Sequence, residues 1–330
     1  MNSLQRFKAA LNFQPVDRLP VIEWAPWWDK TIERWRTEGL PVLESYEEYF
    51  GLDPLYWCRF SEKKPGIPTP AYHGAALVRN EADYDKLRRD FLYTEPADQE
   101  NLATLKKLKG RTAKGEVLIS VAVAGFFYWP RALFGIEPHF FAFYDHAPLM
   151  HRMNADQMRY IEKTLDYVLG MTDVAMIVLN EDLSYNHGPM ISKDLFDEFM
   201  APYYREFTAM FRKRGLPLIV DTDGLMEEMI PWFTEVGMDG CLPIERQAAN
   251  DIPRMRRNHP AWRMVGGFDK MVMHKGEAAM RREFERLLPV MKGGGYVLGV
   301  DHQTPPEVSL NDYRLYLKLF NEYARRAATR

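Results

Sequence analysis

The sequence predicts an α/β protein that forms one (β/α)8 barrel, a TIM barrel, over residues 1–330. Short apolar runs alternate along the chain with long amphipathic patterns, which is typical of parallel strands joined by helices. Seven or eight such units in a chain of 330 residues fit a closed barrel better than an open sheet. A G-x-G-x-x-G motif does not follow the first run, which argues against a dinucleotide-binding fold.

The strands are predicted from runs of β-branched and other apolar residues that end at Gly, Pro, Asn or Asp. They are expected at residues 19–24, 116–123, 175–180, 216–220, 238–243, 262–267 and 294–300. An eighth strand is expected within residues 52–81, around "LYWCRF" or "AALVR".

The helices are predicted from apolar residues that recur every three or four positions. Residues 192–214 carry such a stripe, with Ser192 as the N-cap and Gly215 as the stop signal. Residues 277–291 and 310–326 show the same pattern. The barrel is expected to carry an N-terminal extension before its first strand. A solvated helical insertion, over residues 85–115, is expected between the first strands.

Charge and cysteine content exclude several classes of protein. The formal net charge is −3 without a block of like charges, which argues against binding to nucleic acid or an anionic membrane. The two cysteines, Cys58 and Cys241, cannot form a disulfide framework. The longest apolar run is too short to span a bilayer, and the first residues lack a signal-peptide core. We therefore predict a cytoplasmic protein.

Acidic and histidine side chains follow most of the predicted strands. In a barrel, residues at these positions meet at one rim, where enzymes of this architecture place their active sites. The residues are Glu23, Glu181, Asp182, His187, Asp221, Asp223, Glu245, Asp269, Asp301 and His302. Because Asp also makes turns and caps helices, each of them singly has a structural alternative.

Asp221 and Asp223 lie two residues apart at the end of one predicted strand, so both can face the same side. Two carboxylates that close repel each other unless a cation lies between them or one of them holds a proton. The pair therefore predicts a divalent metal, a cationic substrate or a raised pKa. Carboxylates together with a neutral imidazole suit zinc, or a harder ion such as manganese.

The sequence resembles the uroporphyrinogen decarboxylase (URO-D) superfamily almost from end to end. The resemblance is carried by "RFKAALNFQPVDRLPV", "GFFYWPRALFG", "EDLSYNHGPMIS", "VDTDG", "GGFDK" and "GGYVLGVDHQTPPEVSL". This resemblance implies a (β/α)8 barrel whose site lies at the strand C-termini. Members include decarboxylases of uroporphyrinogen, zinc-dependent methyltransferases that use corrinoid proteins or thiols, and uncharacterised branches. Relatives commonly pair, which implies a homodimer.

The chain departs from the true decarboxylases after its first predicted strand. Their arginine-rich "MRQAGR" segment, which binds substrate carboxylates, is replaced here by "EWAPWWDK", and no arginine lies between Arg18 and Arg34. An acid-lined pocket would repel a substrate that carries many carboxylates. The chain therefore resembles the uncharacterised or methyltransferase-like branch more closely than the true decarboxylases.

The resemblance to the methyltransferases implies a metal site. Their zinc ligands are a His-x-Cys pair and a later Cys, and related methionine synthases add a Glu. Asp221 and Asp223 fall on the pair, Glu245 falls on the Glu, and His302, or Asp301 beside it, lies near the last Cys. We therefore predict Zn²⁺ or another divalent metal on Asp221, Asp223, Glu245 and His302, with oxygen donors in place of thiolates.

Aromatic residues after the first two predicted strands suggest a pocket for a methylated substrate. Trp24, Trp27, Phe126 and Phe127 could hold a quaternary amine by cation–π contact, although core packing is the simpler alternative. The predicted substrate-binding set adds residues whose side chains are polar or aromatic. These are Glu23, Tyr185, His187 and Asp269.

The predicted function is a metal-assisted transfer of a methyl group between a small methylated substrate and a corrinoid or folate acceptor. The predicted catalytic residues are Asp221, Asp223, Glu181, Asp182 and His302, with Glu181 or Asp182 orienting the substrate and His302 alternatively acting as a general acid. The chain lacks a D-x-H-x-x-G motif, so a corrinoid would arrive on a partner protein. The alternatives are a metal-independent decarboxylase for another carboxylated substrate, and a non-catalytic barrel that binds a small molecule.

Overall fold

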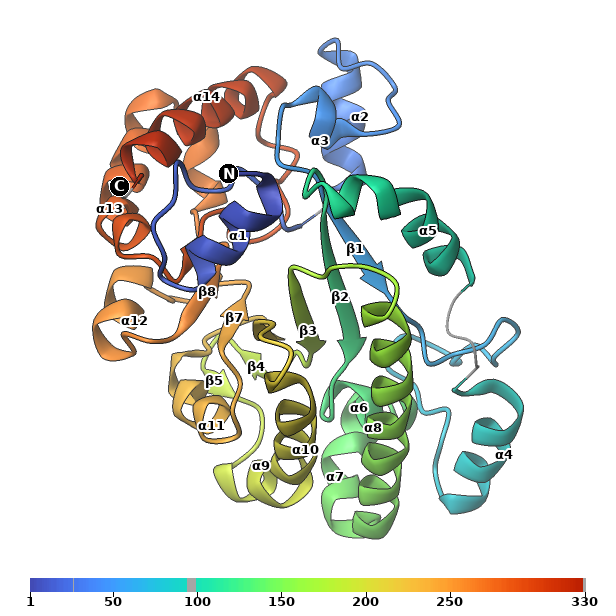
Figure 1. Cartoon of the computed structure of the whole chain (residues 1–330). Coiled ribbons are helices and arrows are strands. Elements are labelled where there is room, and N and C mark those ends of the chain that lie inside the picture. The colour runs from blue at the N-terminus through green and yellow to red at the C-terminus, as the bar shows by residue number, and fades with distance from the viewer. Residues whose placement is uncertain (26, 94–98, 329–330) are drawn as a thin grey trace.

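A curled parallel sheet of seven strands forms the centre of the structure, a computed structural model that describes residues 1–25, 27–93 and 99–328 (Figure 1). The spatial order is β1-β2-β3-β6-β7-β8-β9. The strands are β1 (Leu55–Arg59), β2 (Leu118–Ala124), β3 (Met176–Asn180), β6 (Leu218–Asp221), β7 (Gly240–Leu242), β8 (Arg263–Val265) and β9 (Tyr296–Val297). A separate hairpin pairs β4 (Ser184–Tyr185) with β5 (Gly188–Pro189).

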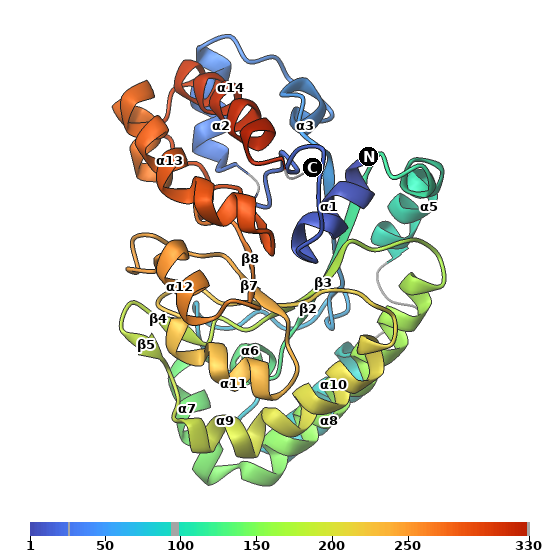
Figure 2. The same cartoon turned by 60° about the vertical axis from the view of Figure 1, so that its left-hand side comes forward.

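Helices cover the outside of the sheet, as parallel strands require. Figure 2 shows α8 and α10 lying side by side along one flank. The helices are α1 (Ser3–Leu11), α2 (Asp29–Thr37), α3 (Tyr46–Tyr49), α4 (Glu81–Phe91), α5 (Gln99–Ala113), α6 (Tyr128–Phe134), α7 (Ile136–Asp145), α8 (Ala147–Leu169), α9 (Lys193–Phe199), α10 (Ala201–Arg212), α11 (Ile230–Glu235), α12 (Ile252–Asn258), α13 (Glu277–Gly293) and α14 (Leu310–Arg326). Two 3₁₀ helices are η1 (Glu227–Met229) and η2 (Lys270–Lys275).

The prediction of a strand at residues 19–24 is wrong, although the segment lies between β9 and β1. Side chains take part in its hydrogen bonds to these neighbours, so it lacks the regular backbone hydrogen-bond ladder of a strand. The Asp53 amide donates to the Val21 carbonyl over 2.8 Å, but the Val21 amide donates to the Asp53 carboxylate over 2.9 Å. On the other side the Trp24 indole N–H donates to the Val300 carbonyl. The structure thus shows a barrel-like sheet, and the closed eight-stranded barrel stays a prediction.

The helix predicted over 192–214 is two helices, α9 and α10. Pro202 lacks the amide that would continue the helical hydrogen bonds, and its ring disfavours helical geometry just before it. The backbone therefore turns at Met200, where φ is −120°. The Ser192 side chain accepts a hydrogen bond from the Leu195 amide, which confirms the predicted N-cap.

Helices lie both before β1 and between β1 and β2. α1 lies at the end of the sheet where the strands begin, and the β4–β5 hairpin lies at the opposite end (Figure 1). The predicted insertion 85–115 contains the end of α4 and the whole of α5. Residues 94–98, between these two helices, lie outside the described residues. Every described helix is too short or too polar to cross a lipid bilayer.

Candidate active site

A cavity of about 560 Å³ opens at the end of the sheet where the strands finish. We call it the rim cavity. Residues 23–25 and 27, the ends of three strands and residues 302–303 form most of its wall. Arg59, Asn180 and Asp221 are the last residues of β1, β3 and β6, and all three line it. The cavity therefore lies where a barrel enzyme places its chemistry.

Asp221 and Asp223 both line the rim cavity, as the two-residue spacing predicts. Burial is the main cause that raises the pKa of the Asp221 carboxyl well above its usual range, and the nearby Asp182 and Asp223 carboxylates add to it. Burial, together with Glu245 and Asp182, raises the pKa of Asp223 to about 7. The strand end thus concentrates carboxyl groups that ionise fully only beside a cation.

Three of the four predicted metal ligands come together. Asp223, Glu245 and His302 each offer a ligand atom, and these atoms lie within 4.8 Å of one another. The Glu245 carboxylate is fixed by the Gly224 amide, which donates to its Oε2 over 2.9 Å. Asp221 lines the same cavity but stands outside this group of three. Two carboxylates and one imidazole are a donor set that suits zinc or a harder divalent ion.

The hydrogen bonding of His302 sets a condition on metal binding. Its Nδ1 accepts a hydrogen bond from the Gln303 amide over 2.8 Å, so Nε2 carries the proton of the neutral ring. Nε2 lies 3.9 Å from the Asp223 Oδ1. Burial lowers the pKa of His302, which keeps the ring neutral. A metal on Nε2 would require Nδ1 to take the proton and to give up the Gln303 hydrogen bond, whereas the two carboxylates fit a metal as they stand.

Glu181 and Asp182 are neighbours in sequence but point to different places. Glu181 is fully buried, and its carboxylate accepts hydrogen bonds from the amides of residues 126–128 and from the Tyr204 hydroxyl. A Cβ on Gly125 would lie 2.2 Å from this carboxylate, which explains the glycine there. Glu181 thus holds the loop after β2, and we keep only Asp182 as a residue that orients substrate. Asp182 lines the rim cavity and pairs with Arg131 over 3.1 Å.

Glu23 is a buried carboxyl group in the wall of the rim cavity, only 7% exposed. Its Oε1 accepts a hydrogen bond from the Tyr313 hydroxyl over 3.2 Å, and its Oε2 is buried without a partner among the described residues. Burial raises the pKa of Glu23 from 4.5 to about 8. The group therefore holds a proton at neutral pH and can donate it in a hydrogen bond to a ligand.

This raised pKa predicts how the Glu23→Gln variant depends on pH. Between the unfolded pKa of 4.5 and the folded pKa of about 8, unfolding releases the Glu23 proton, so the wild type loses stability as pH rises through this window. The variant lacks this loss. We expect its free energy of unfolding to gain on that of the wild type from pH 4.5 towards pH 8. Denaturant unfolding at several pH values measures this difference, and a constant difference would contradict the prediction.

The prediction that four aromatic residues line the substrate pocket is only partly right. Trp24 and Trp27 line the rim cavity. Phe126 and Phe127 are fully buried away from it, Phe126 against Tyr204 and Phe127 against His139. Burial in the core is the simpler alternative for these two phenylalanines, and it is what the structure shows.

Three other predicted substrate-binding residues lie outside the rim cavity. Tyr185 and His187 are exposed on the β4–β5 hairpin, where their rings contact each other. Asp269 caps η2, and its carboxylate accepts hydrogen bonds from the Met271 amide and the Gln247 side chain. Asp269 thus has the structural role that is the alternative for each of these acids, because it caps a helix.

Arg59 is one of several cavity residues that the sequence reasoning missed, and it is the arginine among them. It ends β1, lines the rim cavity, and its guanidinium lies 5.2 Å from the Trp57 ring centroid. Its charge lowers the pKa of Asp221, against the other causes that raise it. The signal was present, because "LYWCRF" places an arginine at the end of an apolar run. The cavity is therefore acidic but not uniformly so.

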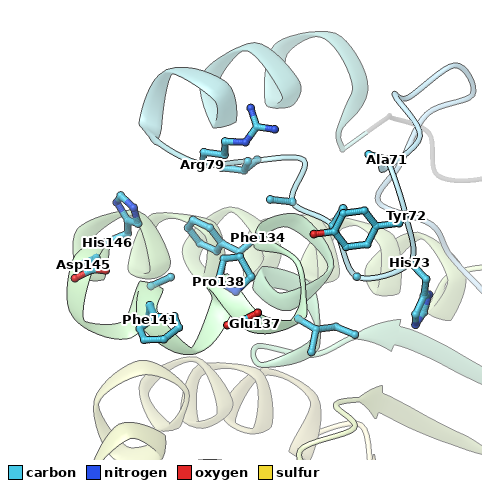
Figure 3. A pocket seen from close by; sticks show the side chains of 16 residues that line it. Ala71, Tyr72, His73, Arg79, Phe134, Glu137, Pro138, Phe141, Asp145 and His146 are labelled. Atoms are coloured by element: carbon cyan, nitrogen blue, oxygen red, sulfur yellow. The ribbon is translucent and has the colours of Figure 1, made fainter.

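A second and larger cavity, of about 740 Å³, lies away from the strand ends between residues 71–79 and α7. Figure 3 shows its wall, with Tyr72, Phe134 and Phe141 beside the polar Arg79 and Glu137. It contains none of the acids predicted for the rim. We take the smaller rim cavity as the candidate active site, because the carboxylates converge there.

Comparisons with known proteins bear on the family and the fold. Residues 77–323 match the family model described as uroporphyrinogen decarboxylase (URO-D). A uroporphyrinogen decarboxylase of Nautilia profundicola is 23% identical over 189 residues, which are 56% of this chain and 52% of that protein. The matched region thus spans about half the length of this relative.

The solved structure of a methyltransferase from Methanosarcina mazei aligns with nearly the whole molecule. The alignment covers 98% of this chain and 99% of that chain, with a TM-score of 0.62 and 14% identity. At this level of identity the similarity describes the fold alone.

Proposed function

Because the chain belongs to the uroporphyrinogen decarboxylase family, we propose that it is an enzyme of the methyltransferase-like branch, which moves a methyl group between a small methylated substrate and a corrinoid or folate acceptor. The corrinoid would be carried by a separate protein. The single observation that carries the proposal is the rim cavity, whose wall contains several carboxyl groups, tryptophans and one arginine. Such a wall attracts positive charge, and it disfavours a substrate that carries many carboxylates.

The cavity residues have roles that follow from the charge that moves during methyl transfer. The bond from the methyl carbon to the substrate heteroatom breaks and leaves its electron pair on that heteroatom, while the acceptor supplies the pair for the new bond. The methyl group carries positive charge between the two atoms. Asp221 and Asp223, which both line the cavity, would stabilise that charge. Asp182, fixed by Arg131, orients the substrate.

We also propose that Asp223, Glu245 and His302 hold a divalent metal, zinc or a harder ion. When bound, it would act as a Lewis acid on the leaving heteroatom or would activate the acceptor. The proximity of the three ligand atoms supports the proposal. Asp221, which stands outside the three, remains free to face the substrate.

Removal of one metal ligand is expected to weaken zinc binding. Asp223→Asn and Glu245→Gln should each lower the zinc affinity of the purified chain by about tenfold or more, because each removes a charged donor. Equilibrium dialysis followed by elemental analysis measures this loss. Asp269→Asn is the matched control, since it is the same change at an acid that caps η2 and lies outside the three. If the wild type retains no metal, or the variants retain as much as the control, the metal part of the proposal is wrong.

A decarboxylase that acts on another carboxylated substrate is the second candidate, and the arginine in the cavity favours it. Arg59 could hold a substrate carboxylate, while Asp221 stabilises positive charge beside the departing CO2. Assays with methylated and carboxylated compounds, which follow methyl loss and CO2 release separately, distinguish the two. CO2 release without methyl transfer would overturn our leading proposal. Binding without either reaction would favour a non-catalytic barrel.

A further inference from the structure

We infer that the substrate of the rim cavity is a zwitterion, a compound with a methylated onium group at one end and a carboxylate at the other. This inference rests on the proposed function and names its substrate class. Arg59 would bind the carboxylate. Asp221 and the tryptophans of the wall would hold the onium group.

Arg59 is the cation that the cavity offers to an anion. In the described part of the chain its guanidinium forms no ion pair, in contrast to Arg131, which the Asp182 carboxylate occupies. Its side chain is exposed at the end of β1, beside the Trp57 ring. An unpaired guanidinium in a concave site can bind a carboxylate through two parallel hydrogen bonds.

Other residues of the cavity wall suit a cation. Asp221 ends β6, which β2 and β3 separate from β1, the strand that Arg59 ends. The charge of Arg59 still lowers the pKa of Asp221, although the two side chains form no ion pair in the described part of the chain. Tryptophan rings line the same cavity. The indole N–H groups of Trp24 and Trp57 donate to the carbonyls of Val300 and Trp24, so both rings are held in place. Fixed aromatic rings beside a carboxylate favour a quaternary ammonium or sulfonium group.

A third polar group in the wall still needs a partner. Glu23 is more than nine-tenths buried, it lines the rim cavity, and its Oε2 has no hydrogen-bond partner among the described residues. Buried polar atoms are almost always paired. The Val300 amide and the Tyr316 hydroxyl also act on this carboxyl group, and a ligand with a polar group at this place would complete its hydrogen bonding. The cavity of about 560 Å³ holds a small zwitterion and leaves space for the methyl acceptor.

Three probes of nearly the same shape separate the two charges. N,N,N-trimethylglycine carries both charges, choline lacks the carboxylate, and 3,3-dimethylbutanoate has carbon in place of the nitrogen. Isothermal titration calorimetry with the full chain, without any methyl acceptor, gives the three affinities. We expect trimethylglycine to bind about 10- to 100-fold more tightly than choline, because a hydrogen-bonded charge pair contributes that much. It should also bind more tightly than 3,3-dimethylbutanoate.

Variants assign each charge to its residue. Arg59→Gln should remove the preference for trimethylglycine over choline while the affinity for choline stays unchanged. Asp221→Asn should weaken trimethylglycine and choline but not 3,3-dimethylbutanoate. Arg79→Gln, in the second cavity, is the control that should change nothing. Thermal unfolding of each variant confirms that it folds, and Arg59→Lys, which keeps the charge, should restore part of the preference.

The inference is overturned if trimethylglycine binds no more tightly than choline, if none of the probes binds, or if Arg59→Gln weakens all three equally. Because the test needs no turnover, it separates this inference from the proposed function. Selective binding without any later methyl transfer would support the substrate class and count against the reaction. Methyl transfer from a substrate that has no carboxylate would do the opposite.

Discussion

Replacement of Asp223 by asparagine is expected to lower the rate of methyl transfer by about 10²- to 10⁴-fold, the range for a charged group that acts directly on the reacting atoms. Asp223 belongs both to the rim cavity and to the proposed metal-binding group. It lines the rim cavity, its Oδ1 is 3.9 Å from the His302 Nε2, and it belongs to the group that could hold a metal. Asparagine keeps the shape and removes the charge, so a fall in rate reports the carboxylate itself.

The same variant should change the pH dependence of the reaction. The pKa of Asp223 is about 7, so the carboxyl is neutral in acid and ionised above neutrality. If the ionised form stabilises positive charge, kcat/KM of the wild type should rise through that pH. In Asp223→Asn this rise should be absent, while Asp269→Asn should keep it. A variant with the rate and pH profile of the wild type would show that Asp223 has no part in the reaction.

Removal of the Glu181 carboxylate is expected to destabilise the protein by at least about 3 kcal/mol, because it leaves several buried hydrogen-bond donors without a partner. The carboxylate accepts hydrogen bonds from the amides of residues 126–128 and from Tyr204. In Glu181→Ala these donors are left in a site that is closed to water. Each unpaired buried donor costs about 1–3 kcal/mol.

Denaturant unfolding followed by circular dichroism measures this loss. Glu198→Ala is the control, because Glu198 is exposed on α9 and should change the free energy of unfolding by less than about 0.5 kcal/mol. A result for Glu181→Ala as small as that of the control would contradict the role of this carboxylate in holding the loop. Partial recovery in Glu181→Gln, which keeps one acceptor oxygen, would support it.

The positions of most strands and helices could be predicted, because they depend on local patterns. The run "AMIVLN" became β3, and "LYWCR" became β1 from the two places considered. The cap at Ser192 is equally local, since its side chain bonds an amide three residues away. The same reasoning failed at residues 19–24. Their apolar pattern is that of a strand, but side chains of Asp53 and Trp24 make the bonds that a ladder would make.

The sequence by itself determined that acids and tryptophans follow the strands of a parallel sheet, and hence that a negatively charged site lies at one rim. Only the tertiary structure decided which of these side chains meet. Glu181 and Asp182 are adjacent, yet the loop 126–128 takes one of them into the core and leaves the other in the cavity. Asp269, like Asp223, follows a predicted strand, but its carboxylate accepts hydrogen bonds from the Met271 amide and the Gln247 side chain. Arg59 enters the site from a strand far away along the chain. The direction of a side chain at a strand end depends on loops and helices that are distant in sequence, and a local pattern contains no information about them.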